Sequence, residues 1–316
     1  MTRVLVIRGG AIGDFILTLP IFEAIHVKDP AAEIEVLGYP DIAELAVERR
    51  HAIAAKRVDA AEWAPLFAVS GQLAQRERGY LAGFDRIFCV WPDKDGTICR
   101  NLLVAGARSV AHVDPMPPAG EVIHAIDHVA RQCLRAGLEL PYLEPHLYPS
   151  ERDRWWVERF MRVTRAGERP LLGLEPGSGS ARKNWPARNY QELARQWLRR
   201  QGHVLLVAGP ADDAAVAEMK DGLLGDGIFP LCNESLPRVA AALERCEAFV
   251  GNDSGITHMA AAVRTPTLAL FGPTDPRVWR PRAPRVRALA PAQGNDLADI
   301  SVSEVTKQLG ELLRPA

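Results

Sequence analysis

Residues 248–263 read AFVGNDSGITHMAAAV, which places a short polar turn between an apolar strand-like run and a helix-like run. The strand-like run covers 248–250, the helix-like run covers 259–263, and Gly251 and Gly255 bracket the turn. Such a turn exposes backbone N–H groups at the positive end of a helix dipole, which is a common phosphate site. The stretch therefore predicts an α/β fold that binds a phosphorylated ligand at this turn.

Two side chains of the turn support this prediction. The imidazole of His258 can donate a hydrogen bond to a phosphate oxygen, and the carboxylate of Asp253 can hold the loop in shape. The rest of the chain then has to indicate which phosphorylated ligand is bound.

Length and composition limit the class of protein. The chain has 316 residues, which is too many for one hydrophobic core, so two domains are expected. The formal net charge of −1 argues against a general nucleic-acid binder. Five scattered cysteines without a C-x-x-C pair indicate reduced thiols of a cytoplasmic protein. No apolar run approaches the roughly 18–20 residues of a membrane span, and the N-terminus is typical of a strand, not of a signal peptide.

Strand-like and helix-like runs alternate in both halves of the chain, a pattern typical of α/β domains with parallel sheets. In the first half, strands are expected at 4–7, 33–37 and 86–91, and helices at 15–26, 41–50 and 124–137. In the second half, strands are expected at 171–174, 203–208, 248–250 and 267–271, and helices at 151–165, 187–201 and 301–313.

A linker is expected between the halves, because residues 138–151 carry three prolines and no hydrophobic period. We therefore expect an N-terminal domain of residues 1–145 and a C-terminal domain of residues 146–316, both doubly wound and facing across a cleft. Ligands bind doubly wound sheets in the loops at the carboxyl ends of the strands. The glycine-rich loops of this chain take that place.

The first glycine-rich loop reads RGGAIGD at residues 8–14. It does not fit the dinucleotide fingerprint G-x-G-x-x-G, because Arg8 takes the first glycine position and no acid ends the second strand. The loop places the carboxylate of Asp14 at the start of a helix. Position alone leaves two interpretations open, an acid that complements the helix dipole or a general base that faces the cleft.

The second glycine-rich loop reads EPGSGSARKNWP at residues 175–186. Arg182 and Lys183 can neutralise phosphate charge, and Ser178 and Ser180 can donate hydrogen bonds to phosphate oxygens. The P-loop pattern is absent. The alternative is a polar loop with a solvated basic pair, and the presence of a second phosphate-like loop in the same half favours binding.

Metal binding is not expected. The triplet Asp93-Lys94-Asp95 could hold Mg²⁺ through its carboxylates, but the glycine that follows favours a simple turn. The histidines outside the turn are isolated, and no His/Cys/Asp cluster has zinc-ligand spacing. Several basic residues of the first half are either solvated helix faces or contacts for an anionic acceptor or membrane surface. They are Arg49, Arg50, Lys56, Arg57, Arg76, Arg78 and Arg100.

Four pieces of the chain, taken in order, resemble glycosyltransferase family 9, the ADP-heptose:lipopolysaccharide heptosyltransferases. They are RGGAIGDFILTLP at 8–20, PGSGSARKNWP at 176–186, GNDSGITHMAAA at 251–262 and TPTLALFGPTDP at 265–276. The resemblance implies a GT-B architecture, with two Rossmann-like domains that bind the acceptor and the nucleotide sugar. It also implies an inverting, metal-independent enzyme without a cofactor, and a final helix near 301–313 that returns to the first domain.

The resemblance also assigns roles to residues. Asp14 matches the catalytic carboxylate that takes the proton of the acceptor hydroxyl, and Lys183 matches the lysine on the donor diphosphate. Asp213 falls near the place of an acid on the ribose, although Asp212 is nearly as good a candidate. The expected nucleotide-sugar site consists of Gly13, Ser178, Gly179, Ser180, Asp213, Asp253, Ser254, Gly255 and His258.

One position departs from the family pattern, because many relatives have histidine where this chain has Glu175. A carboxylate repels a diphosphate, so we expect Glu175 to point away from it or to contact a sugar hydroxyl. This departure leaves the exact donor open. The alternatives to a heptosyltransferase are the same fold with a different nucleotide-sugar donor or acceptor, a nucleotide-sugar epimerase, and a non-catalytic binder; Asp14 argues against the last two, since neither needs this base.

The family implies the partners and the location as well. They are a nucleotide-sugar donor, which is expected to be ADP-heptose, and a lipopolysaccharide inner-core acceptor. No nucleic acid is expected. The protein is expected in the cytoplasm, in peripheral contact with the inner face of the inner membrane.

Overall fold

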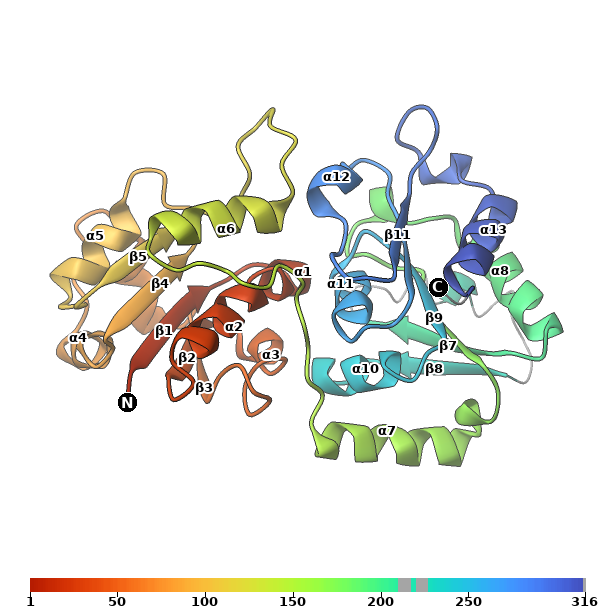
Figure 1. The fold of residues 1–316 in the computed structure, drawn as a ribbon, viewed down its shortest axis with the longest axis horizontal. Coiled ribbons are helices and arrows are strands. Elements are labelled where there is room, and N and C mark those ends of the chain that lie inside the picture. Colours follow the sequence, from red (N-terminus) through yellow and green to blue (C-terminus); the bar gives the residue numbers. More distant parts are fainter. Residues whose placement is uncertain (210–216, 220–226, 315–316) are drawn as a thin grey trace. The chain divides into compact units, whose positions relative to one another are not determined.

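The computed structural model describes residues 1–209, 217–219 and 227–314. The chain divides into two compact units, Met1–Tyr148 and Pro149–Ala316. Each unit is an α/β domain built on one parallel sheet (Figure 1). The division falls within the segment that the sequence indicates as a linker.

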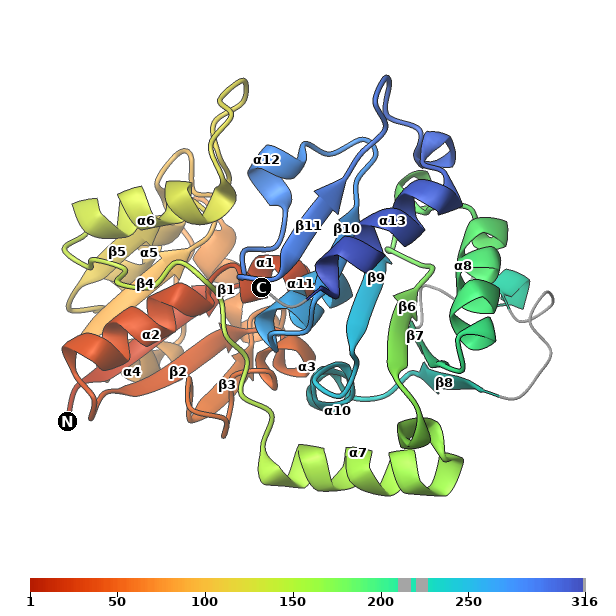
Figure 2. The ribbon, with the colours of Figure 1, turned by 45° about the vertical axis from the view of Figure 1, so that its right-hand side comes forward.

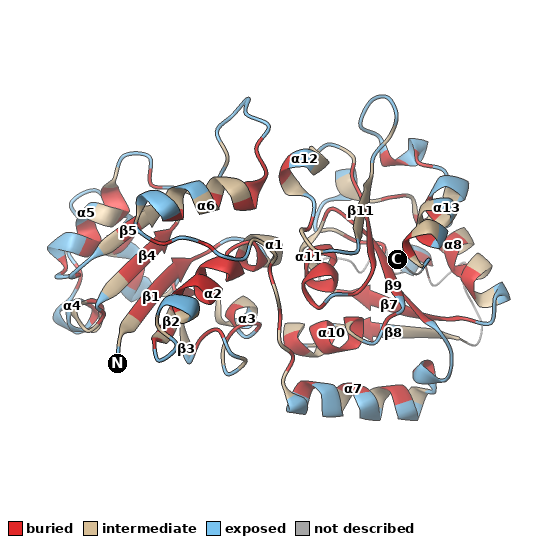
Figure 3. Cartoon of the chain, viewed as in Figure 1, coloured by how far each residue is buried: buried red, intermediate tan, exposed pale blue. Residues whose placement is uncertain are grey.

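The sheet of the first unit has the strand order β3-β2-β1-β4-β5, and all its neighbouring strands are parallel. Its strands are β1 (Arg3–Arg8), β2 (Glu33–Gly38), β3 (Ala54–Arg57), β4 (Arg86–Val90) and β5 (Val110–Val113). Its helices are α1 (Ile12–Ile16), α2 (Leu19–Lys28), α3 (Pro40–Ala43), α4 (Gln75–Ala82), α5 (Thr97–Val104), α6 (Ala125–Arg135) and the 3-10 helix η1 (Ala61–Phe67). The central strands β1 and β4 are buried on both faces, which explains their continuous apolar sequence (Figure 3).

Two of the expected helices of the first unit differ in the structure. The helix expected at 15–26 is two helices, α1 and α2, and Pro20 lies in the first turn of α2, where its missing N–H costs nothing. The helix expected at 41–50 ends at Ala43. A helix could not extend to residue 50 in any case, because Glu48 and Arg50 take positive φ angles that a right-handed helix excludes.

The sheet of the second unit has the order β11-β10-β9-β6-β7-β8 and is also parallel. Its strands are β6 (Leu171–Glu175), β7 (His203–Ala208), β8 (Ile228–Cys232), β9 (Ala248–Asn252), β10 (Thr267–Leu270) and β11 (Val286–Leu289). Its helices include α7 (Glu151–Thr164), α8 (Ala187–Arg199), α10 (Leu236–Leu243), α11 (Gly255–Ala262), α12 (Pro276–Trp279), α13 (Val302–Leu312) and the 3-10 helices η2 (Ala166–Glu168), η3 (Ala181–Lys183) and η4 (Leu297–Asp299).

Both sheets place the reversal of strand order beside their first strand, between β1 and β4 and between β6 and β9. In the second unit this is the full Rossmann order, in which ligands bind in the crevice outside the carboxyl ends of the strands at the reversal. The loops after β1, β6 and β9 therefore lie where a doubly wound sheet binds its ligand.

The last helix, α13, packs against α8, β10 and β11 of the second unit (Figure 2). Its side chains Val305, Leu309 and Leu312 are buried in the hydrophobic core of that unit. The apolar face of α13 thus covers the second sheet beside β10 and β11. The packing on the first domain that the family resemblance implies stays a prediction. None of the helices in the described residues combines the length and the apolar character that crossing a bilayer requires.

Candidate functional site

The turn after β9 presents the N-terminus of helix α11. Ser254 caps this helix, because its Oγ accepts a hydrogen bond from the N–H of Thr257 at 3.1 Å. The next two residues, Gly255 and Ile256, are partly exposed, and their N–H groups form no hydrogen bond with the part of the chain that the structure describes. Two donors and the positive end of the helix dipole are therefore available to an anion.

Asn252, the last residue of β9, fixes the loop that follows the neighbouring strand β6. Its side chain is completely buried, and its Nδ2 donates to the carbonyl oxygens of Pro176 and Gly177, each at 3.0 Å. Its Oδ1 accepts from the N–H of Trp185 at 2.9 Å and from the hydroxyl of Tyr190 at 3.1 Å. The amide of Asn252 thus holds both ends of the loop. The sequence did not indicate this role, because Asn252 is one of several polar residues in the turn.

Lys183 lies beside the turn as a consequence of this loop geometry. Its Nζ donates to Oδ2 of Asp253 at 2.7 Å, and the hydroxyl of Thr274 donates to the same oxygen at 2.6 Å. The carboxylate of Asp253 is nearly buried at 9% exposure, whereas the Lys183 side chain is 30% exposed. The ammonium group is therefore held at the turn while keeping access to solvent. The contribution of Thr274, from the loop after β10, was not anticipated from the sequence.

Glu175 is the last residue of β6, and its side chain is buried behind the turn after β9, with 2% exposed. Its carboxylate accepts a hydrogen bond from the hydroxyl of Ser254, and the hydroxyl of Thr257 lies 3.5 Å away. Burial, and next the charge of Glu175, raise the pKa of the Tyr190 phenol above its ordinary value. The carboxylate that departs from the family pattern is thus a structural partner of the cap of α11.

The loop after β1 holds a second ion pair. Arg8 is buried, and its Nη2 lies 3.3 Å from Oδ1 of Asp14, while its Nε donates to the hydroxyl of Thr18 at 3.1 Å. Oδ2 of Asp14 accepts from the N–H of Ala11 at 2.9 Å. Burial lowers the pKa of Arg8, and the charge of Asp14 opposes that shift. Arg8 is therefore the cation that orients Asp14. The sequence analysis did not predict this role, because it considered Arg8 only as the residue that breaks the dinucleotide fingerprint.

The absence of a side chain at Gly10 leaves space for the carboxylate of Asp14. The residue has φ +96°, and a Cβ there would lie 2.8 Å from Oδ2 of Asp14. Only glycine fits such a position without strain. Asp14 remains partly open, with 34% of its side chain exposed.

The remaining predicted residues take different places. Ser178 turns inward, because its hydroxyl lies 2.9 Å from the carbonyl of Ser180 and 2.5 Å from Oδ1 of Asn184. Gly179 has φ +71° and is exposed, as is Ser180. His258 is buried on α11, and Gly13 lies in α1, partly exposed. Asp212 and Asp213 lie outside the described residues.

The acidic triplet near residue 94 takes part in turns of the first unit. Asp93 accepts from the N–H groups of Ile98 at 3.0 Å and Cys99 at 2.9 Å, and Asp95 accepts from the hydroxyl of Thr97 at 2.9 Å. Both carboxylates are therefore engaged at the start of α5. Over residues 1–209, 217–219 and 227–314, no three His, Cys, Asp or Glu side chains are arranged to hold a metal ion.

Comparison with known proteins adds a family to this geometry. The sequence profile of glycosyltransferase family 9 (heptosyltransferase) matches residues 116–307. The chain is 30% identical over 199 residues to the lipooligosaccharide heptosyltransferase 2 of Haemophilus influenzae, a match that covers 55% of this chain and 57% of that relative. The chain thus spans little more than half the length of the curated relative.

Solved structures match over the full chain. The glycosyl transferase family 9 protein of Veillonella parvula has a TM-score of 0.82 at 20% identity, covering 99% of this chain and 97% of that one. The ADP-heptose lps heptosyltransferase II of E. coli has a TM-score of 0.79 at 22% identity, with 99% and 98% covered. These likenesses confirm the expected GT-B fold.

Replacing Asn252 by leucine tests whether this amide holds the two loops together. The variant Asn252→Leu has a similar volume but leaves buried carbonyls and the Trp185 N–H without partners. We expect a loss of about 3–5 kcal/mol in the free energy of unfolding, since each orphaned buried group costs about 1–3 kcal/mol. Urea unfolding measures it. The exposed Asn295→Leu is the control and should change stability by less than about 0.5 kcal/mol. A loss of less than about 1 kcal/mol in Asn252→Leu would contradict the role of the amide.

Proposed function

The chain belongs to glycosyltransferase family 9 (heptosyltransferase), and we propose that it transfers a heptose from ADP-heptose to the inner core of a lipopolysaccharide. The observation that carries the proposal is the anion site after β9, where free N–H groups of α11 and the ammonium of Lys183 converge. The names of its relatives support the sugar and the acceptor, because they include a lipooligosaccharide heptosyltransferase and an ADP-heptose lps heptosyltransferase.

The donor diphosphate binds at the turn of residues 253–255 in this proposal. Lys183 exchanges its contact with Asp253 for a phosphate oxygen, or holds both at once. Asp253 and Thr274 keep the ammonium at the turn before the donor arrives, so little reorganisation is needed. As the bond between the anomeric carbon and the diphosphate breaks, negative charge grows on the leaving ADP. A preorganised cation and backbone N–H groups stabilise that charge more than they stabilise the intact donor.

Asp14 acts as the general base of the transfer. The acceptor hydroxyl oxygen attacks the anomeric carbon, the ADP leaves with the electron pair of the broken C–O bond, and Asp14 takes the hydroxyl proton. Attack opposite the leaving group inverts the anomeric configuration. Arg8 fixes the orientation of the Asp14 carboxylate through its contacts with Oδ1 and with Thr18. No cofactor and no metal ion take part in the proposed reaction.

The proposed acceptor determines the location of the protein. A lipopolysaccharide precursor is an amphiphile, so the protein works in the cytoplasm in peripheral contact with the inner face of the inner membrane. Basic residues of the first unit suit the anionic groups of such an acceptor. The family match favours sugar transfer over the epimerase alternative.

Product formation tests the proposed activity. The protein is incubated with ADP-heptose and truncated lipopolysaccharide acceptors in the presence of EDTA, and the product is identified by mass spectrometry. We expect the acceptor mass to rise by one heptose and ADP to be released in equal amount. Absence of transfer alongside measurable ADP binding would exclude this donor and acceptor pair, and the same assay with other nucleotide sugars would identify the donor.

Removal of the Asp14 carboxylate tests its role as base. The variant Asp14→Asn keeps the size of the side chain but cannot take a proton, so kcat should fall by about 10²–10⁴-fold. ADP affinity, measured by calorimetry, should remain within about twofold, because Asp14 does not touch the diphosphate in this mechanism.

The matched control is Asp41→Asn, an exposed acid at the N-terminus of helix α3 in the same unit. It should leave kcat unchanged, which separates a general base from an acid that only complements a helix dipole. Loss of ADP binding in Asp14→Asn, or transfer within about tenfold of the unaltered protein, would refute the proposed base.

A further inference from the structure

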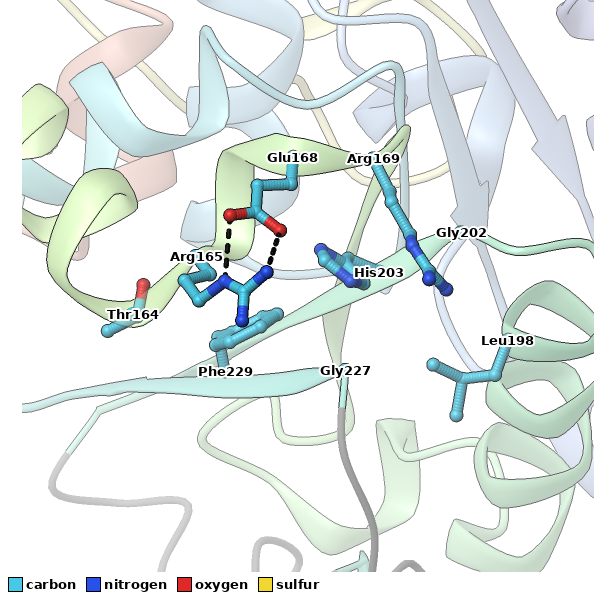
Figure 4. A pocket seen from close by; sticks show the side chains of 9 residues that line it. All are labelled: Thr164, Arg165, Glu168, Arg169, Leu198, Gly202, His203, Gly227 and Phe229. Atoms are coloured by element: carbon cyan, nitrogen blue, oxygen red, sulfur yellow. Dashed lines mark hydrogen bonds and ion pairs between the residues drawn. The ribbon is translucent and has the colours of Figure 1, made fainter.

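A cavity of about 370 Å³ lies in the second unit at the amino ends of β7 and β8 (Figure 4). His203 is the first residue of β7 and Phe229 is the second of β8. The candidate donor loops follow the carboxyl ends of β6 and β9, so the cavity belongs to the opposite edge of the same parallel sheet. Its lining residues are Thr164, Arg165, Glu168, Arg169, Leu198, Gly202, His203, Gly227 and Phe229.

His203 is a buried polar group that the described protein satisfies on one side only. Its side chain is 8% exposed, and its Nδ1 donates to the carbonyl of Ala166 at 3.0 Å. The edge of the ring packs against Phe229, with ring centroids 5.1 Å apart. The second ring nitrogen, Nε2, has no partner among the described residues. This nitrogen is open to the cavity, where a ligand can supply the missing polar partner.

Among the described residues that line the cavity, one positive charge has no charged partner. Arg165 and Glu168 form a bidentate pair, with N···O distances of 2.7 and 2.9 Å. Arg169 forms no hydrogen bond or ion pair with the described residues. Two arginines and one glutamate give the described lining a net charge of about +1, which suits a monoanion better than a doubly charged phosphate. In Figure 4 the ring of His203 lies between Arg169 and the Arg165–Glu168 pair.

The shape of the cavity depends on Gly227. This glycine has φ +99°, and a Cβ there would lie 2.9 Å from Cδ2 of Leu198 and 3.4 Å from the ring of His203. The missing side chain leaves the cavity open beside His203. Phe229 and Leu198 add apolar surface to the wall. The volume is at the small end of the range for ligand pockets, so the ligand is small.

We propose that this cavity binds a small monocarboxylate with an apolar body. The guanidinium of Arg169 forms a fork that matches the two oxygens of a carboxylate. His203 donates from Nε2 to the same group when its ring is protonated, and the apolar body lies against Phe229 and Leu198. The site is independent of the transfer reaction and of the loops that serve it.

Benzoate is the probe, added to the full chain and followed by calorimetry and by the ring signals of His203 in ¹H–¹⁵N spectra. We expect saturable binding with a Kd on the order of 1 mM and a shift of the His203 ring signals. Arg169→Gln should weaken binding by about tenfold or more, because it removes the charged partner.

The matched control is Arg245→Gln, which removes an exposed arginine of the same unit that does not line the cavity. It should bind benzoate as the unaltered protein does. Benzyl alcohol, which lacks the charge, should not shift the His203 signals. Equal binding by Arg169→Gln, no response of His203 to about 10 mM benzoate, or tighter binding of inorganic phosphate than of benzoate would overturn the proposal.

Discussion

The buried amide of Asn252 is the interaction on which the second unit's ligand loops depend. It lies at the reversal of strand order, where β9 runs beside β6, and it bonds backbone groups on both sides of the loop that follows β6. Both its donors and its acceptor are used, so this conformation of the loop leaves no polar atom of the buried amide unpaired. That conformation places Lys183 against Asp253 and leaves the first N–H groups of α11 open. The position of the proposed catalytic cation thus follows from a residue that touches no ligand.

In each unit, a residue of the candidate site forms an ion pair within the protein itself. Arg8 holds Asp14 in the first unit, and Asp253 holds Lys183 in the second. A buried or half-buried charge is costly without a partner, so each pair stabilises its two side chains and fixes their orientation. Glu175 extends the principle, because its buried carboxylate binds the hydroxyl of Ser254 and so supports the cap of α11. A negative charge near a diphosphate site is compatible with anion binding when it is used to orient donors.

The sequence predicted the parallel α/β fold and most long elements, because buried strands and amphipathic helices have strong periodic patterns. It missed β3, β5, β8 and β11, which are short and partly exposed, and it merged α1 with α2 because the apolar run continues through the break. The glycine-rich loops were recognisable from their composition. The partners Arg8, Asn252 and Thr274 were not, because their roles depend on contacts between segments that are distant in the sequence or concealed by a motif. The packing of α13 on the second sheet could not be read from its amphipathic pattern, which indicates an apolar face but not its neighbour.

Amide hydrogen exchange with and without ADP tests the central claim, that the donor's diphosphate binds the turn after β9 and the loop after β6. Exchange should slow in peptides that cover residues 177–184 and 253–258 when ADP is bound. The loop of residues 9–14 should show no comparable change with ADP alone, because Asp14 acts on the acceptor in the proposed mechanism. Protection confined to other parts of the chain, with residues 253–258 unchanged, would rule out diphosphate binding at the turn after β9.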